Sequence, residues 1–229
     1  MTTWPVIAIL GGLALLAAGL YWELIVAEGA HLGPRVVVWL YDLVARRYER
    51  IKKFKRDLDD DYLGWPLAVT LVHVDAPRVL DVAAGTGRAA RSLLRQVAFS
   101  GAVINVELSA RMLEEGCRLT ALWPGRAAWV RSPAERLPFP ANAFDVVMCL
   151  EALEFFPDAR VALAECVRVL RPGGWLLVTN RVGLSAKLIV GKTFTRVAFR
   201  RLLEQFPLEA VRVEPWQVEY DLARGCKTS

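Results

Sequence analysis

Short apolar segments typical of strands alternate with helix-like segments between Arg78 and Thr179, and few folds accommodate that order. Strands are predicted at 78–82, 102–106, 127–130, 144–150 and 175–179, with helices at 87–99, 110–122 and 159–170. Strands that alternate with helices build parallel sheets with right-handed crossovers. Two more strand-like segments follow at 208–213 and 218–223. The sequence therefore predicts an α/β fold with a doubly wound, mostly parallel seven-stranded sheet.

Segment 6–26 is apolar apart from one glutamate near its end. As a helix it would measure about 32 Å at roughly 1.5 Å per residue, which matches the hydrocarbon core of a bilayer. Aromatic residues at its two ends (Trp4, Tyr21, Trp22) suit the two headgroup layers. A buried core helix and a cleaved signal peptide are the alternatives, but a signal peptide would need a basic start and a small-residue cleavage site. We expect an uncleaved, single-span transmembrane anchor over residues 1–27.

Residues 28–63 are predicted as a basic juxtamembrane segment of one or two helices. The part from 28 to 56 holds eight Lys or Arg and three acidic residues, a balance of +5 that equals the net charge of the whole chain. Because positive loops beside a span stay in the cytoplasm, we expect the remaining domain, residues 64–229, to face the cytoplasm. The segment should also lie against anionic lipid headgroups. A nucleic-acid patch and an ordinary solvated helix face are the alternatives, and no nucleic-acid partner is expected.

Two local patterns add to this outline. Trp65-Pro66 is expected to interrupt the helices, with 67–74 continuing as a helix into the domain. Segment 181–201 holds six basic residues and no acid, and three of them recur every four residues (Lys192, Arg196, Arg200). That spacing predicts a basic stripe on one helix. The helix would cover the sheet or, alternatively, lie on a membrane surface.

The cysteines and histidines do not suggest a metal centre. The four cysteines (Cys117, Cys149, Cys166, Cys226) have no C-x-x-C spacing, and most fall in apolar or helical runs. We expect reduced packing thiols in a reducing compartment. With two histidines in the chain and no Cys/His or Asp/Glu cluster, no metal site is predicted.

Acidic and glycine residues follow the first two predicted strands, at the edge where doubly wound sheets bind ligands. The first strand contains Asp81 and leads into Gly85-Thr86-Gly87, where glycine permits a tight turn. The second ends in Glu107, whose carboxylate could hold two ribose hydroxyls. Taken alone, 85–90 also fits the dinucleotide pattern G-x-G-x-x-G/A. A glycine turn beside a surface glutamate is the purely structural alternative.

Five motifs decide whether this glycine turn binds a dinucleotide or another cofactor that contains ribose. They are 79–87 (VLDVAAGTG), 106–113 (VELSARML), 134–139 (AERLPF), 144–147 (FDVV) and 169–174 (VLRPGG). Their order and spacing over residues 41–180 strongly resemble class I S-adenosylmethionine-dependent methyltransferases. The segment 41–48 (YDLVARRY) is similar to the Y-D-x-x-A-x-x-Y segment of the branch that contains quinone-ring C-methyltransferases and phosphatidylethanolamine N-methyltransferases. The resemblance implies S-adenosylmethionine as the cofactor.

The resemblance also implies which residues bind that cofactor. They are Asp81, Ala83, Gly85 and Gly87 at the methionine end; Glu107 at the ribose hydroxyls; Leu108 and Met112 beside the adenine; Ala134 and Glu135 at the adenine edge; Tyr48 as a cover; and Leu150 and Glu151 beside the sulfonium.

Two positions depart from the family pattern. Ala83 replaces the first glycine of D-x-G-x-G-x-G, a replacement that is tolerable where the backbone keeps a negative φ. Pro133 replaces the aspartate that commonly accepts the adenine amino group, and proline offers neither a side-chain acceptor nor an N–H. Ser132 or a backbone carbonyl would have to substitute.

Methyl transfer requires mainly in-line positioning and desolvation, because the sulfonium is already a strong electrophile. A general base helps where the acceptor carries a proton at its attack site. The candidate catalytic residues are Glu154, His73 and Tyr41, and a structural role is the alternative for each. A carboxylate such as Glu151 or Glu154 could instead stabilise a cationic amine acceptor.

The sequence thus favours a membrane-tethered methyltransferase that acts on a hydrophobic or interfacial small molecule, such as a lipid or a quinone. A tether would raise the local concentration of a lipid-soluble acceptor. A nicotinamide-dependent oxidoreductase is the second hypothesis, disfavoured by Asp81 before the glycines and by the later Pro-Gly-Gly turn. A non-catalytic, membrane-anchored cofactor-binding scaffold is the third, and Pro133 is its best support.

Overall fold

Seven strands form one sheet in the order β3-β2-β1-β4-β5-β7-β6 in the computed structural model, which describes residues 4–229. The strands are β1 (Arg78–Val82), β2 (Ala102–Glu107), β3 (Ala127–Arg131), β4 (Phe144–Cys149), β5 (Leu170–Arg181), β6 (Leu208–Gln217) and β7 (Tyr220–Lys227). Neighbours from β3 to β5 are parallel, whereas β7 runs antiparallel to both β5 and β6. The predicted mostly parallel, seven-stranded α/β fold is confirmed.

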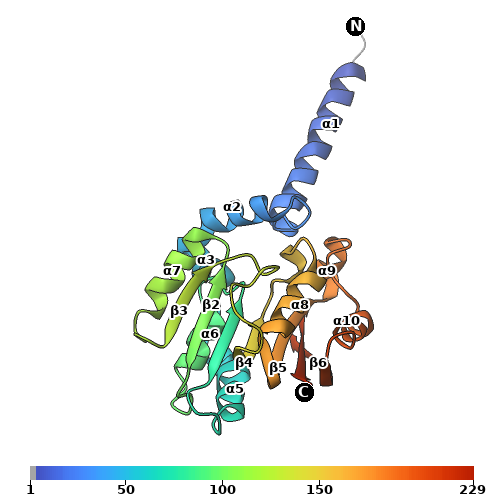
Figure 1. Ribbon diagram of the computed structural model, residues 1–229. Helices are drawn as coiled ribbons and strands as arrows, with labels where there is room; N and C mark the ends of the chain where they lie inside the picture. The colour runs from blue at the N-terminus through green and yellow to red at the C-terminus, as the bar shows by residue number, and fades with distance from the viewer. Residues whose placement is uncertain (1–3) are drawn as a thin grey trace.

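Residues along the central strands alternate between the two faces of the sheet. Leu80 and Val147 join the core cluster that also contains residues of α8 (Ala159–Val169) and α10 (Arg196–Leu203). Val79 and Val146 join the opposite cluster, with residues of α5 (Trp65–Thr70) and α6 (Arg88–Leu94). Every residue of β4 is buried, as expected of a strand covered on both faces. Helices therefore cover both faces of the sheet, as Figure 1 shows.

The order of strands reverses between β1 and β4. From β1 the chain moves outward through β2 and β3, with α7 (Ala110–Thr120) between these two strands, and then returns to β4 on the other side of β1. Open α/β sheets bind ligands outside the carboxyl ends of the strands at such a reversal. The fold thus places the crevice beside the residues that follow β1, β2 and β4.

The basic segment is divided into more helices than expected. It contains α2 (Pro34–Val44), η2 (Ala45–Arg47), α3 (Tyr48–Lys52), α4 (Arg56–Asp59) and the π-helical η3 (Asp60–Gly64). Lys53 ends α3 in the left-handed region with φ +50°. The interruption predicted at Trp65-Pro66 is wrong, because η3 runs directly into α5. Pro66 lies in the first turn of α5, where a helix does not need its N–H.

The basic stripe predicted over 181–201 is also wrong. Arg181 ends β5, α9 (Gly183–Leu188) follows, and Lys192 lies in the loop before α10. Gly191 has φ +76°, and the Thr195 side chain accepts a hydrogen bond from the N–H of Ala198 as the N-cap of α10. These two features start a new helix, so the three cations do not share one face.

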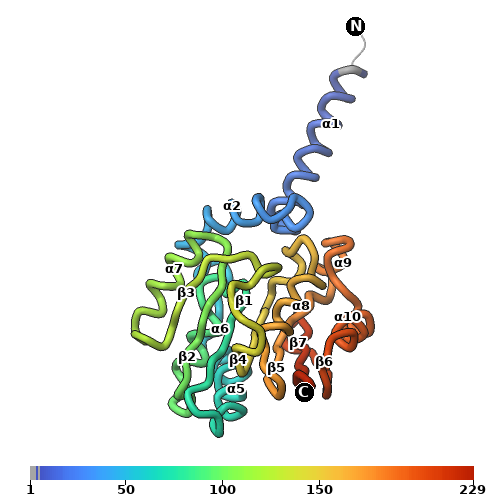
Figure 2. The backbone as a smooth tube through the Cα atoms, viewed as in Figure 1, coloured from blue at the N-terminus to red at the C-terminus, as the bar shows by residue number. Residues whose placement is uncertain are grey.

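The apolar N-terminal segment stands away from the domain (Figure 2). It forms α1 (Trp4–Tyr21) and the π-helical η1 (Trp22–Val26). Val6–Val26 is long and apolar enough to cross a membrane, and none of it is buried inside the protein, which excludes a core helix. Its foot is attached to the domain, because Ala27 and Ala30 are buried against Ile189.

All four cysteines are free thiols. Cys149 and Cys166 are buried, as packing thiols should be, and burial raises the pKa of the Cys166 thiol to about 12. Cys117 is exposed, so the expectation that it packs in the core is wrong. Within residues 4–229 no group of His, Cys, Asp or Glu is arranged to hold a metal ion.

Candidate functional site

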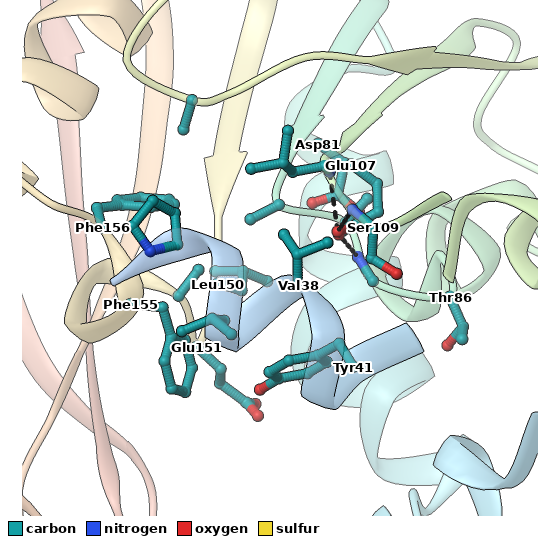
Figure 3. Close-up of a pocket in the computed structure, with 18 of the residues that line it drawn as sticks. Val38, Tyr41, Asp81, Thr86, Glu107, Ser109, Leu150, Glu151, Phe155 and Phe156 are labelled. Carbon is teal, nitrogen blue, oxygen red and sulfur yellow. Dashed lines mark hydrogen bonds between the residues drawn. The ribbon is translucent and has the colours of Figure 1, made fainter. Parts of the chain in front are cut away.

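A pocket lies at the carboxyl ends of β1, β2 and β4, and α2 closes its other side (Figure 3). It brings together most of the residues expected to bind the cofactor: Tyr48, Asp81, Ala83, Gly85, Glu107, Leu108, Ala134, Glu135, Leu150 and Glu151. Tyr41, a candidate base, also lines it. Two expected residues, Met112 and Gly87, do not line the pocket. Met112 is nevertheless close to it, because a Cβ atom added to Gly85 would lie 3.7 Å from the Met112 Cε atom.

The glycine turn after β1 uses positive φ angles at three alternate residues. Ala83, Gly85 and Gly87 have φ +56°, +57° and +78°. A Cβ at Gly87 would also approach the Trp129 ring to 2.9 Å, so only glycine fits there. Alanine was expected to replace glycine at position 83 without strain if the backbone kept a negative φ. The φ of Ala83 is positive, so this expectation is wrong. The left-handed conformation costs a non-glycine residue roughly 1–2 kcal/mol.

Replacing Ala83 by glycine should therefore stabilise the protein. The strain relieved exceeds the roughly 0.4–1 kcal/mol that glycine's flexibility adds to the unfolded state, which leaves a gain of about 0.5–1 kcal/mol. Urea unfolding of the Ala83→Gly variant measures this gain directly. A lower midpoint than that of the parent chain would show that residue 83 is unstrained.

The Glu107 carboxylate is held in place by the backbone around it. Its Oε1 atom accepts hydrogen bonds from the N–H groups of Leu108 and Ser109 at 2.9 and 2.8 Å. Its Oε2 atom accepts one from the Gly85 N–H at 2.8 Å, which connects the ends of β1 and β2. Burial raises the pKa of this carboxyl group, and the three hydrogen bonds oppose that shift. A carboxylate oxygen has two lone pairs, so Oε2 retains capacity for a hydroxyl donor in the pocket.

Asp81 is buried with an unsatisfied acceptor. Its side chain lines the pocket, and no donor in residues 4–229 contacts its Oδ2 atom. Burial raises the pKa of this carboxyl group to about 7, with a contribution from the charge of Glu107, while Arg88 opposes the shift. A buried carboxyl group without a partner favours a cationic or hydrogen-donating ligand. The ammonium of a methionine moiety fits this requirement.

Glu135 offers a second unsatisfied acceptor in the pocket lining. Its Oε1 atom is buried and has no hydrogen-bond donor among the described residues. The carboxylate lies two residues after Pro133, which has no side-chain acceptor. The hydroxyl of Ser132 also lines the pocket; it donates to the backbone oxygen of Arg136 at 2.9 Å and keeps its own lone pairs. Both side chains can accept from an adenine amino group, and a carboxylate is the stronger acceptor.

Glu151 lies at the end of β4 in a charged wall of the pocket. It has φ +55°, and its Oε1 atom accepts a hydrogen bond from the Arg88 Nη2 atom at 2.5 Å. The Arg88 guanidinium also stacks over the Phe54 ring, 4.4 Å from its centroid. Neither Arg88 nor Phe54 is apparent as a site residue in the sequence, because their contacts join segments far apart in the chain.

Aromatic rings from α2, α3 and η4 (Leu153–Phe155) form the cover of the pocket. The Tyr41 ring lies 5.8 Å from the Tyr48 ring and 5.8 Å from the Phe155 ring, measured between centroids. Burial is the main cause that raises the pKa values of Tyr41 and Tyr48, so both remain neutral phenols at physiological pH. Tyr48 thus lies where a cover over the cofactor was expected.

Tyr41 connects the pocket to a glutamate that the sequence analysis missed. Its hydroxyl donates to the Glu28 Oε2 atom at 2.9 Å. The other oxygen of Glu28 accepts from the Lys52 Nζ atom at 3.3 Å and lies 3.6 Å from an Arg181 nitrogen. Glu28 has φ +50° in the turn between η1 and α2. No motif marks this residue, because the fold of that turn alone brings it to Tyr41.

The other two candidate bases lie outside the pocket lining. Glu154 is buried behind it, where its Oε1 atom accepts from the Tyr220 hydroxyl at 2.8 Å and lies 3.6 Å from Arg181. Burial raises the pKa of its carboxyl group. His73 is exposed in the turn that precedes β1, at the amino end of that strand, whereas the pocket lies at the carboxyl ends of the strands. A catalytic role for His73 is therefore inconsistent with the fold.

Comparison with known proteins gives consistent results. Residues 80–178 match the methyltransferase domain family. The chain is 42% identical over 126 residues to the ubiquinone/menaquinone biosynthesis C-methyltransferase UbiE of Hahella chejuensis, which covers 54% of this chain and 50% of that protein. It is 41% identical over 103 residues to UbiE of Stutzerimonas stutzeri, covering 44% and 40%. The chain thus spans half or less of the length of these relatives.

Solved structures show the same architecture at low sequence identity. A SAM-dependent methyltransferase from Aquifex aeolicus superposes with a TM-score of 0.61 at 18% identity, covering 77% of this chain and 96% of that one. The [4+2]-cyclase SpnF superposes with a TM-score of 0.66 at 17% identity, covering 86% and 96%. These likenesses establish the fold alone, and a fold can support unrelated reactions.

Proposed function

Because this chain belongs to the class I S-adenosylmethionine-dependent methyltransferases, for which S-adenosylmethionine is the implied cofactor, we propose that it methylates a hydrophobic, quinone-like or lipid acceptor beside a membrane. The observation that carries the proposal is the set of buried acceptors around one pocket. Asp81 and Glu135 each have an oxygen with no donor among the described residues. Glu107 ends β2, which lies between β1, where Asp81 is found, and β3, which is followed by the loop that holds Glu135.

Three acidic residues would hold successive parts of the cofactor. Asp81 would bind the ammonium group, Glu107 would accept from a ribose hydroxyl, and Glu135 would accept from the adenine amino group. Leu108 and Ala134 line the same pocket and would contact the adenine faces. When bound, the cofactor supplies an electrophilic methyl group, so the protein has mainly to orient the acceptor and exclude water.

The acceptor side of the pocket is apolar. Val38 of α2 lies opposite Leu150, Phe155 and Phe156 in the pocket, and Val37 is part of the same lining. Such a lining suits the ring of a quinone-like acceptor or the first part of a lipid chain better than a charged amine. The names of the UbiE relatives support a quinone-like acceptor.

Proton removal from the acceptor is assigned to Tyr41 and Glu28. The Tyr41 phenol accepts the acceptor's proton on its oxygen while it passes its own proton to the Glu28 Oε2 atom, 2.9 Å away. The phenol never has to ionise, which agrees with its raised pKa. Lys52 and Arg181 balance the charge of Glu28 before the transfer.

The Tyr41→Phe variant should lose about 100-fold or more in turnover, the usual scale of general acid–base catalysis, while its affinity for S-adenosylmethionine stays unchanged. Glu28→Gln should have the same effect, because it interrupts the same transfer. Single-turnover rates and calorimetric affinities separate the two quantities. Full turnover in Tyr41→Phe would remove this residue from the proton path.

The anchor places the reaction at the bilayer surface. The helix over Val6–Val26 is long and apolar enough to span, and the basic residues that follow favour a cytoplasmic domain. Confinement near the bilayer raises the effective concentration of a membrane-dissolved acceptor.

The proposed function is tested by labelling. Membranes that contain the full chain are incubated with methyl-labelled S-adenosylmethionine, and lipid extracts are examined by mass spectrometry. A labelled, extractable quinone or lipid that disappears in the Tyr41→Phe variant is the expected result. Label confined to water-soluble molecules or to protein would contradict the proposed acceptor class, and no labelled species at all would contradict the activity.

A further inference from the structure

The helix α2 has two different faces. Pro34, Val37, Val38 and Tyr41 line the pocket, and their spacing places them on one side of the helix. Trp39 and Leu43 lie on the other side, where 53% and 64% of their surface is exposed. Exposure of such a pair does not by itself indicate a partner, because Trp65 and Val69 of α5 are exposed in the same way; the position of α2 in the fold and the charges around it have to decide.

The anchor fixes where this outer face lies. Figure 1 shows α2 running crosswise at the foot of α1, between α1 and the sheet. The foot is attached to the domain, because the Nε2 atom of His31 contacts the backbone oxygen of Val190 at 3.0 Å and its Nδ1 atom lies 3.2 Å from Glu23. If α1 spans the bilayer, the outer face of α2 therefore lies at the level of the lipid headgroups.

The charges around this face suit an anionic membrane. Arg35 is exposed on the same side of α2 as Trp39 and Leu43, one turn before Trp39. Three more exposed arginines follow the helix (Arg46, Arg47, Arg50). Apolar and aromatic residues flanked by arginine are typical of helices that lie in the plane of a lipid interface.

Asp42, at the side of α2 between its two faces, connects the helix to the cofactor site. Asp42 accepts hydrogen bonds from the Ser109 hydroxyl at 2.5 Å and from the Arg111 N–H at 3.1 Å. The N–H of Ser109 in turn donates to Glu107, at the proposed ribose site. A force that holds α2 in place therefore also holds Glu107 and the cover formed by Tyr41.

We propose that the outer face of α2 (Arg35, Trp39 and Leu43) docks on an anionic lipid bilayer, and that this contact holds the pocket in its cofactor-binding form. The proposal rests on the proposed function for the identity of the cofactor. Its consequence is that the protein binds S-adenosylmethionine more tightly on a membrane of the right charge than in detergent. The enzyme would then be fully competent only where its acceptor is found.

The membrane contact is tested by quenching of tryptophan fluorescence. The full chain is placed in nanodiscs whose anionic lipids carry bromine on their acyl chains, beside a Trp39→Phe variant. The fluorescence contributed by Trp39, taken as the difference between the two chains, is expected to be quenched by the brominated lipid and protected from acrylamide. The opposite pattern would overturn the proposal, as would protection from both quenchers through association of two copies.

The coupling is tested by affinity. In nanodiscs with anionic lipid, a Trp39→Ser, Leu43→Ser double variant should bind S-adenosylmethionine at least about fivefold more weakly than the parent, the low end of coupling between linked sites. In detergent the two chains should bind alike. Leu122→Ser, on an exposed leucine remote from α2, is the matched control and should change neither affinity.

These measurements distinguish failure of the proposed function from failure of the coupling through α2. If the parent chain binds no S-adenosylmethionine under any condition, the proposed function itself is wrong. If the parent binds equally well in anionic nanodiscs, neutral nanodiscs and detergent, the cofactor assignment survives and the coupling through α2 is overturned.

Discussion

Replacing Glu107 by alanine is expected to weaken binding of S-adenosylmethionine at least about tenfold. The lone pair left on Oε2 can accept one hydrogen bond from a ribose hydroxyl, which is worth roughly 1.5–3 kcal/mol, and about 1.4 kcal/mol corresponds to a factor of ten in affinity. The variant also leaves the N–H groups of Gly85, Leu108 and Ser109 without their acceptor, which loosens the turn that carries the cofactor.

Calorimetric titration of the full chain in nanodiscs measures this loss. Glu114→Ala is the matched control, because Glu114 is an exposed acidic residue of α7 outside the pocket lining. It should bind the cofactor as the parent does. An affinity within threefold of the parent in Glu107→Ala would exclude this carboxylate from the cofactor site.

Asp81→Asn should raise the stability of the free protein at pH 8 and lower its affinity for S-adenosylmethionine. In the free protein, burial raises the folded-state pKa of Asp81 to about 7 from an ordinary 3.8. The native state therefore holds a proton that the unfolded chain releases, and stability falls as pH rises from about 4 to 7, by up to about 1.4 kcal/mol per pH unit. Above pH 7 that loss is complete. Asparagine removes the charge, so the variant should be more stable than the parent at pH 8.

The same substitution should weaken the binding of the cofactor. The ammonium of the methionine moiety favours ionised Asp81, so binding to the parent releases a proton below pH 7 and the affinity rises with pH up to about that value. In Asp81→Asn the affinity should be lower and should lose this rise. Paired unfolding and titration series between pH 5 and 8 provide both readouts. A variant that is less stable at pH 8, or that keeps the rise in affinity, would contradict this account of Asp81.

The fold was predictable because its pattern is local. The apolar runs at β1, β2 and β4 are short, continuous and separated by helical segments. This pattern is typical of a parallel sheet whose strands are connected by helices. The errors occurred where local signals conflict with packing. Pro66 fits the first turn of α5 and does not end a helix, and Gly191 with the Thr195 cap divides a segment whose basic spacing suggested one helix.

The cofactor side of the site was predictable for a similar reason. Asp81, Gly85 and Glu107 lie at strand ends, so their positions follow once the strands are placed. The acceptor side depends on contacts between distant segments. The link from Tyr41 to Glu28 requires the fold of the turn between η1 and α2. Glu154, buried beside Tyr220, was not distinguishable from a pocket residue by its place after β4. His73 precedes β1, and that position alone places it at the wrong edge of the sheet.

The central claim concerns one carboxylate and one sugar, and a crystal structure of the chain with S-adenosylhomocysteine tests it most directly. We expect a ribose hydroxyl within hydrogen-bond distance of the Glu107 Oε2 atom and the ammonium group against Asp81. A ligand bound with its ribose away from Glu107, or no ligand in this pocket at saturating concentration, would contradict it.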